Sequence, residues 1–214
     1  MRSWTRDTLT LDAFHGEGGG QVLRTALALS VVLGRRVTLR GIRARRPRPG
    51  LQPQHLTVVR ALAAISDAEV TGDTLDSTEV TFSPRGLRGG SYDFDVGAIR
   101  GSAGSVSLLF QALLLPLTLA TEPSRLVLRG GTHVPWSPPV HYLTGVFLPA
   151  LGRIGVHAEM VLHRWGWYPA GGGEAQASIT PSRHWSALRW HTRPTGPRLA
   201  GVSAVSRQEK LVRE

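Results

Sequence analysis

The hydrophobic positions in the first part of the chain alternate between extended and helical spacing. From Val22 to Leu33, apolar side chains recur every three or four residues, which predicts an amphipathic helix, and Gly34 suits its end. A strand at 8–12 and a glycine loop precede this helix. The further predicted elements are a strand at 36–42, a Pro/Arg loop at 43–53, a helix at 54–65, and short strands at 68–72, 77–82 and 91–96.

The same succession restarts about ninety residues later. A glycine loop leads into an apolar helix, and a strand, a proline-rich loop and another helix follow, at 101–105, 106–120, 125–131, 132–140 and 141–154. This internal repeat of strands and helices predicts an α/β protein in layers, with helices packed on one face of each sheet.

A third glycine loop lies at 168–179, but no further helix pair follows it. We therefore predict three segments: a first unit at 1–90, a second unit at 91–167 and the start of a truncated third unit at 168–214. Truncation is expected because a sheet without its pairing strands leaves an exposed edge.

Composition is that of an ordinary globular chain, with 214 residues of which 41% are hydrophobic. No cysteine is present, which excludes disulfides and thiolate metal sites. The longest apolar run, 106–120, is too short to span a bilayer and contains Gln111 and Pro116. We expect a soluble, cytoplasmic protein without a membrane partner.

The positive charge is concentrated in one segment. The formal net charge is +10, and residues 18–66 contain nine arginines and no Asp or Glu. Such a segment favours a phosphate-bearing partner, either a nucleic acid or a nucleotide. The alternative is a solvated basic face in a protein whose genome favours arginine codons, since Lys210 is the only lysine.

The first glycine loop carries one carboxylate, Glu17, directly before three glycines. A glycine-rich helix start can bind phosphate through its free N–H groups. However, the loop lacks the Lys-Ser/Thr of a Walker A loop, and Gln21 replaces the third glycine of the dinucleotide fingerprint. Glu17 could hold a divalent metal beside phosphates, or it could simply interact with the helix dipole.

A second concentration of polar groups lies in the loop 41–55, where guanidinium groups match phosphate oxygens and prolines stiffen the backbone. An exposed loop without a ligand is the alternative. Gln111, inside an apolar helix, is expected to be substantially buried, either as a structural hydrogen-bonding group or as part of a site. No H-E-x-x-H or G-x-S-x-G pattern occurs, which argues against a zinc enzyme and a serine hydrolase.

Five segments together resemble the RNA 3'-terminal phosphate cyclase family: "GEGGGQVLRTALALS", "GIRARRPRPGLQPQHLTVVRA", "GSAGSVSLLFQALLLPL", "GGTHVPWSPPVHYL" and "GWYPAGGGE". The resemblance extends from about residue 8 to about residue 206, in family order. It implies three repeats, each a four-stranded sheet backed by two helices, and a small inserted domain.

The resemblance also implies a reaction. The family uses ATP and a divalent metal, magnesium or manganese, to adenylylate a histidine. The AMP then passes to the RNA 3'-phosphate, and the 2'-hydroxyl attacks to give a 2',3'-cyclic phosphate. The matching motifs imply that Glu17 acts at the metal and the ATP phosphates, and that Gln111 contacts the nucleotide. The residues implied to contact phosphates of ATP or the RNA end are Arg24, Arg43, Arg46, Gln54 and His55.

The chain also departs from the family pattern. None of its eight histidines matches the family's nucleophilic histidine, which lies near the C-terminus. We therefore expect no catalytic nucleophile in this chain and no adenylylation by it alone. Three interpretations remain open: a fragment of a cyclase, an inactive relative that binds RNA or nucleotides, and a structural repeat protein. A homodimer is possible.

Overall fold

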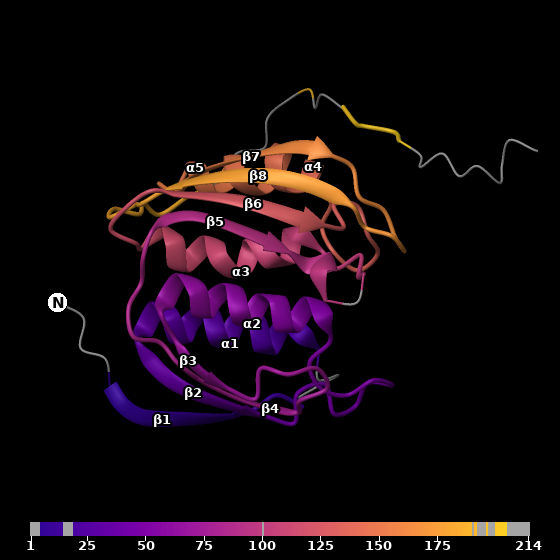
Figure 1. The fold of residues 1–214 in the computed structure, drawn as a ribbon. Helices are drawn as coiled ribbons and strands as arrows, with labels where there is room; N and C mark the ends of the chain where they lie inside the picture. The colour runs from indigo at the N-terminus through magenta and orange to yellow at the C-terminus, as the bar shows by residue number, and fades with distance from the viewer. Residues whose placement is uncertain are drawn as a thin grey trace, which may run out of the picture.

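The computed structural model describes residues 5–14, 19–99, 101–189, 191, 196 and 200–204. Two four-stranded sheets lie on opposite sides of the molecule, and the three long helices α1, α2 and α3 lie between them (Figure 1). Each sheet therefore has one face directed toward the helices. This arrangement confirms the predicted layered α/β fold class.

The first sheet follows the order β1-β2-β4-β3. Its strands are β1 (Thr5–Asp12), β2 (Arg35–Arg40), β3 (Glu69–Thr71) and β4 (Glu79–Ser83). β1 and β2 are parallel, and the other pairs are antiparallel. The connections from β1 to β2 and from β2 to β3 are the helices α1 (Gly20–Leu33) and α2 (Pro53–Ser66).

The second sheet repeats this topology in the order β5-β6-β8-β7. Its strands are β5 (Gly90–Asp95), β6 (Ser124–Gly130), β7 (His157–Arg164) and β8 (Gly173–Thr180). Again only the first two strands are parallel. Between β5 and β6 lie the short 3-10 helix η1 (Val96–Ala98) and the helix α3 (Val106–Thr118). β6 is connected to β7 by α4 (Val140–Tyr142), the π segment η2 (Leu143–Phe147) and α5 (Leu148–Gly152).

The third glycine loop has a different role from the predicted one. Residues 173–180 form β8, which pairs with β6 and β7 and completes the second sheet. The prediction that a third unit starts at 168 is therefore wrong for this segment. Gly171 and Gly172 have φ of 72° and 70° and turn the chain between antiparallel strands, whereas the first glycine loop precedes a helix. The described residues after Thr180 contain no helix or strand.

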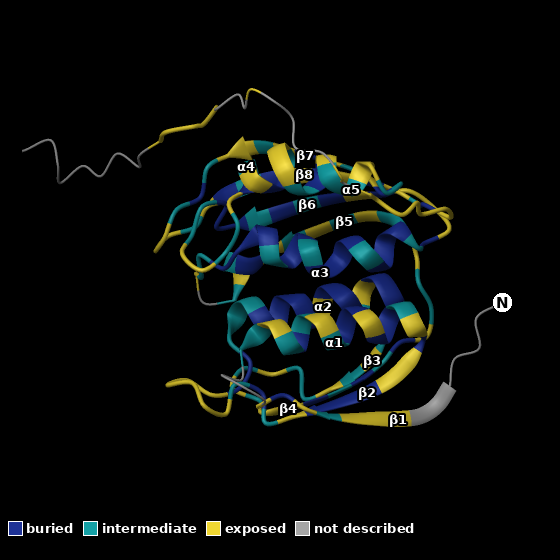
Figure 2. Ribbon diagram, turned by 180° about the vertical axis from the view of Figure 1, so that it is seen from behind, coloured by how far each residue is buried: buried dark blue, intermediate teal, exposed yellow. Residues whose placement is uncertain are grey.

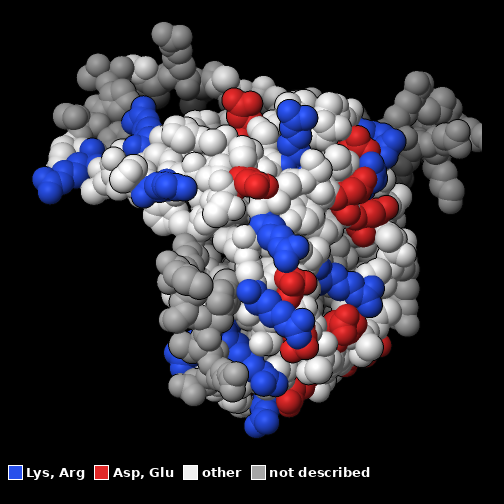
Figure 3. Space-filling model, turned by 60° about the vertical axis from the view of Figure 1, so that its left-hand side comes forward, with Lys and Arg blue, Asp and Glu red and all other residues white. Residues whose placement is uncertain are grey.

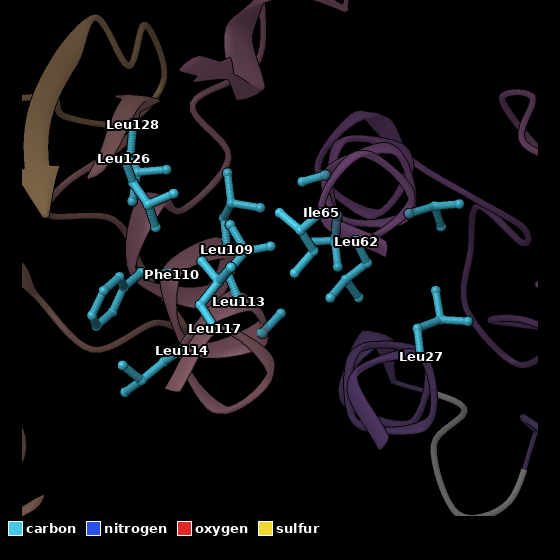
Figure 4. Packing of buried hydrophobic residues seen from close by; sticks show 14 of the residues in the cluster. Leu27, Leu62, Ile65, Leu109, Phe110, Leu113, Leu114, Leu117, Leu126 and Leu128 are labelled. Atoms are coloured by element: carbon cyan, nitrogen blue, oxygen red, sulfur yellow. The ribbon is translucent and has the colours of Figure 1, made fainter. Parts of the chain in front are cut away.

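The core lies where α3 packs between the second sheet and the first helix pair. Figure 4 shows the apolar side chains of α3 between β6 and α2, with Leu109 and Leu113 among them. Both are at most 1% exposed, and Figure 2 shows the same facing sides of α2 and α3 as buried. Because side chains of α3 pack against both units, the two units share one hydrophobic core.

Charged side chains of both signs share the surface of the molecule (Figure 3). Figure 3 shows a face on which Lys/Arg and Asp/Glu side chains are interspersed, and ion pairs such as Arg40 with Glu79 at 3.1 Å belong to the surface. Among the described residues, no helix has both the length and the apolar character needed to cross a membrane.

Candidate nucleotide and RNA-end site

The candidate site lies at the carboxyl ends of the two parallel strand pairs. The chain leaves β1, β2, β5 and β6 toward the same end of the molecule, and the loops after these strands gather there (Figure 1). Ligands of α/β sheets bind preferentially outside such strand ends. A cavity of about 690 Å³ opens between the loops of the two units. The described residues that line it include arginines and a histidine but no Asp or Glu.

The first glycine loop makes room for His55. A Cβ atom built on Gly20 would overlap Nε2 of His55 and would lie 2.6 Å from Cδ2 of the same ring. It would also lie 3.1 Å from Nη1 of Arg24. Gly20 is the first residue of α1, and His55 stands in the first turn of α2. The absent side chain therefore lets two helix starts, an imidazole and a guanidinium approach one another.

His55 is held as a neutral side chain with a defined orientation. It is 2% exposed, and its Nδ1 accepts a hydrogen bond from the backbone N–H of Gln52 at 3.2 Å, which caps α2. Burial, with smaller contributions from the charges of Arg43 and then Arg24, lowers the pKa of His55 from 6.5 to about 3. Because Nδ1 accepts, the proton of the neutral ring is on Nε2. His55 thus directs an N–H donor toward the glycine loop.

The arginine-containing loop 41–55 places like charges close together. Arg43 has a positive φ of 56°, and its Nε and Nη2 donate to the carbonyl oxygen of Arg48 at 3.3 and 3.1 Å. Burial lowers the pKa of Arg43, and the charge of Arg46 adds to this effect. Nη2 of Arg46 lies 3.8 Å from the position that a Cβ on Gly19 would take. An anion between these guanidinium groups would relieve their repulsion.

Arg24 lines a second, narrower groove, which lies between α1 and α3. Its Nη2 donates to Oε1 of Gln21 at 2.9 Å, and burial lowers its pKa. The groove, of about 150 Å³, is lined by Arg24 and Gln111 among others. Gln111 is half-buried there, between the buried residues Phe110 and Ala112. Leu108 lines both the groove and the larger cavity.

The second unit contributes the start of α3. A Cβ on Gly104 would overlap Cγ1 of Val96 and would lie 2.8 Å from Cβ of Gln54, so this glycine allows the two units to touch at the cavity. Ser105 caps α3 by accepting a hydrogen bond from the N–H of Leu108 at 3.2 Å. Residues 102–105 line the cavity. The positive end of the α3 dipole therefore faces the same space as the arginines.

Most of the predicted site residues are brought together. Arg43, Gln54 and His55 line the large cavity, and Nη2 of Arg46 lies near Gly19, which precedes α1. Arg24 and Gln111 both line the narrower groove. Glu17, the predicted metal ligand, falls outside the described residues. Within the described ranges, no group of three His, Asp or Glu side chains could hold a metal ion.

Two aromatic residues of the site were not predicted from the sequence. Trp136 is 100% exposed and Tyr168 is 70% exposed, and both line the cavity. Trp136 stands in a loop between Pro135 and Pro138, and Tyr168 precedes Pro169. An aromatic residue among prolines is the signal that could have identified them, because a stiff loop cannot fold a large side chain back into the core.

The fold and the site define an α/β protein of two repeated units with a basic cavity at the junction of the units. The described residues that line this cavity include no acidic residue. A family model described as RNA 3'-terminal phosphate cyclase matches residues 15–207. The chain belongs to the RNA 3'-terminal phosphate cyclase family.

Its similarity to individual members is high. An RNA 3'-terminal phosphate cyclase of Gloeothece citriformis is 52% identical over 80% of this chain and 50% of the relative. One of Archaeoglobus fulgidus is 47% identical over 81% of this chain and 52% of the relative. One of Hyperthermus butylicus is 42% identical over 96% of this chain and 56% of the relative. The chain thus spans about half the length of the curated relatives it matches.

Proposed function

We propose that this chain forms the phosphate-binding part of an ATP-dependent RNA 3'-terminal phosphate cyclase, which converts an RNA 3'-phosphate to a 2',3'-cyclic phosphate. The observation that carries the proposal is the close approach of Gly20, Arg24 and His55, together with the cavity that His55 lines with Arg43. Family membership supports the same substrate class, because the matched relatives bear the name of this activity.

The residues fit phosphate groups. Nε2 of His55 and the guanidinium of Arg24 both lie close to the position that a Cβ on Gly20 would take. Arg43 and Arg46 add positive charge in the neighbouring loop. His55 would donate its Nε2–H to a phosphate oxygen, and the arginines would neutralise the charge of the phosphates. Gln54 would orient the RNA end from the first turn of α2.

ATP, when bound, would supply the adenylyl group that activates the 3'-phosphate for attack by the neighbouring 2'-hydroxyl. The groove between α1 and α3 would place Arg24 and Gln111 against the nucleotide. A divalent cation would need Glu17 together with phosphate oxygens, a combination that suits magnesium. No histidine of this chain is assigned the role of the nucleophile, so the adenylylation step is proposed to need a group from outside these residues.

The test is the dependence of binding on the terminal phosphate. Short oligoribonucleotides that differ only in a 3'-phosphate or a 3'-hydroxyl end would be titrated with the chain and followed by fluorescence anisotropy. We expect tighter binding of the phosphorylated end, with a strong dependence on salt. Equal affinity for both ends would contradict the cyclase assignment and would support the alternative, an RNA-binding module without end recognition.

A further inference from the structure

Trp136 is placed where a large apolar side chain is least expected. Its indole is 100% exposed, although tryptophan is on average one of the more buried residue types. Its backbone has a φ of 62°, a conformation that is costly for a residue with a bulky side chain. An exposed indole on a strained backbone indicates that contact with a ligand, rather than packing, accounts for this position.

The loop that carries Trp136 is fixed from both sides. Thr132 and His133 donate their backbone N–H groups to the carbonyl oxygen of Gly166 at 2.9 and 3.0 Å. Nε2 of His133 lies 2.8 Å from Nδ1 of His141, and the ring of His133 stacks on Trp165 with 4.2 Å between centroids. These contacts tie the loop 132–139 to the loop 165–172.

Tyr168 belongs to the second of these two loops. It is 70% exposed and lines the same cavity as Trp136. Arg43, Arg48 and His55 line this cavity from the first unit, and no acidic residue is among its described lining. Two exposed aromatic rings therefore stand at the mouth of a basic, phosphate-suited cavity.

Aromatic rings beside a basic groove are how proteins hold single-stranded nucleic acid, because each base offers a flat face for stacking and each phosphate a charge. We propose that Trp136 and Tyr168 stack a nucleobase next to the phosphate that the arginines and His55 bind. This inference rests on the proposed function, since it places the base of the same ligand. The base belongs either to the RNA end or to the adenine nucleotide.

The experiment compares variants of the 214-residue chain. Trp136→Ala and Tyr168→Ala remove the rings, and Trp136→Phe keeps a smaller ring. Trp185→Ala is the matched control, because Trp185 is 48% exposed and does not line the cavity. Each protein would be titrated with a 3'-phosphorylated oligoribonucleotide, with the same oligonucleotide carrying an abasic terminal residue, and with ATP. Thermal unfolding checks that the fold is intact.

We expect Trp136→Ala to weaken binding of one of the base-containing ligands by about 5- to 150-fold, with a smaller loss for Tyr168→Ala. Trp136→Phe should retain most of the affinity, and Trp185→Ala all of it. If the RNA is the source of the base, the penalty falls on the oligonucleotide and nearly disappears with the abasic end. If adenine is the source, the penalty falls on ATP.

Two results would overturn the inference. Wild-type affinity of Trp136→Ala and Tyr168→Ala for both ligands would show that the rings do not stack a base, while the proposed function would stand on the wild-type binding. A wild-type chain that binds neither the phosphorylated oligonucleotide nor ATP would refute the proposed function and this inference together.

Discussion

The imidazole of His55 fills the space beside Gly20 that a side chain on this residue would need, since a Cβ on the glycine would overlap Nε2 of the imidazole. The two residues are thirty-five positions apart and begin different helices. Their contact explains why the chain has glycine at a helix start where many other residues would be tolerated. The glycine makes room for the neutral imidazole of His55, which lines the cavity, so the two residues form one structural unit.

Replacing Gly20 with Ala should therefore destabilise the fold. His55 is 2% exposed and is anchored through Nδ1, so the ring cannot move aside easily. We expect Gly20→Ala to lower the free energy of unfolding by about 1–3 kcal/mol, as overpacking does, although alanine is the better helix former. Urea denaturation measures this change.

Gly19→Ala is the matched control for this substitution. A Cβ at Gly19 would find its nearest neighbour, Nη2 of Arg46, at 3.8 Å, which is an ordinary contact, and the φ of Gly19 is −69°. Because Gly19 is the N-cap of α1, where alanine is less favourable than glycine, we expect a loss of about 0.5–1 kcal/mol, smaller than that of Gly20→Ala. Equal stability losses in the two variants would contradict the packing of Gly20 against His55.

The role of Nε2 of His55 can be separated from its structural role. His55→Asn places an amide oxygen near the position of Nδ1, so it can keep the hydrogen bond to the N–H of Gln52 while Nε2 is lost. We expect it to retain the fold but to bind a 3'-phosphorylated oligonucleotide roughly tenfold less tightly, because a donor to a charged group is removed.

His55→Gln makes the complementary change. Its amide nitrogen can reach the position of Nε2, while the capping acceptor is lost. We expect this variant to be less stable than His55→Asn but to bind the phosphorylated end more tightly. The opposite order of the two affinities would contradict a donor role for Nε2.

The buried His55 also predicts a pH dependence of stability. Burial, with Arg43 and Arg24 next, lowers the pKa of His55 from 6.5 to about 3, so the unfolded chain takes up a proton that the folded chain does not. Stability therefore falls as the pH drops from 6.5 toward 3, by about 1.4 kcal/mol per pH unit from this group. Urea denaturation at several pH values between 7 and 4 measures the slope.

The control for this slope is His55→Asn, which lacks the titrating group and should lose less stability over the same interval. Arg43→Ala should in addition raise the pKa of His55, since it removes one of the charges that lower it. Identical pH slopes for the wild type and His55→Asn would show that His55 is not held neutral.

The packing of α3 between the two units predicts a large effect of truncating its core side chains. Leu113 is 0% exposed, and Leu113→Ala should lower the free energy of unfolding by about 2–5 kcal/mol. Leu33, which is 65% exposed at the end of α1, provides the matched control, and Leu33→Ala should change it by less than about 0.5 kcal/mol. Two separate unfolding transitions in the Leu113 variant would contradict a single shared core.

Much of the fold could be predicted from residue patterns. The helical spacing from Val22 to Leu33, with Gly34 as its end, predicted α1 closely, and Gly34 has a φ of 63° in the structure. The internal repeat predicted recurring units of strands and helices, and both sheets have the same strand order. Local periodicity and capping determine these features, so they can be recognised without long-range information.

Pairing across the sheet could not be predicted in the same way. The glycines of 171–173 look like those of the first loop, yet they lead into β8 instead of a helix. The alternating apolar positions of β8 pack against the core, and β6, the partner that places β8 inside the sheet, is distant in sequence. A glycine cluster permits a turn but does not determine which element follows it.

The candidate site, too, could be predicted only in part from the sequence. The motifs identified Arg43, Gln54 and His55, which line one cavity. Trp136 was not predicted, because its exposure depends on loops of the second unit that are joined through Gly166 and the pair His133 and His141. Contacts between distant loops have no periodic signal in the sequence.

The most direct test of the central claim is the ¹⁵N NMR signal of Nε2 of His55 while an oligoribonucleotide is added. We predict that an oligonucleotide with a 3'-phosphate shifts this signal, because the phosphate accepts its hydrogen bond, and that the same oligonucleotide with a 3'-hydroxyl leaves it nearly unchanged. No shift with the phosphorylated end, or the same shift with both ends, would contradict an RNA-end site at the junction of the two units.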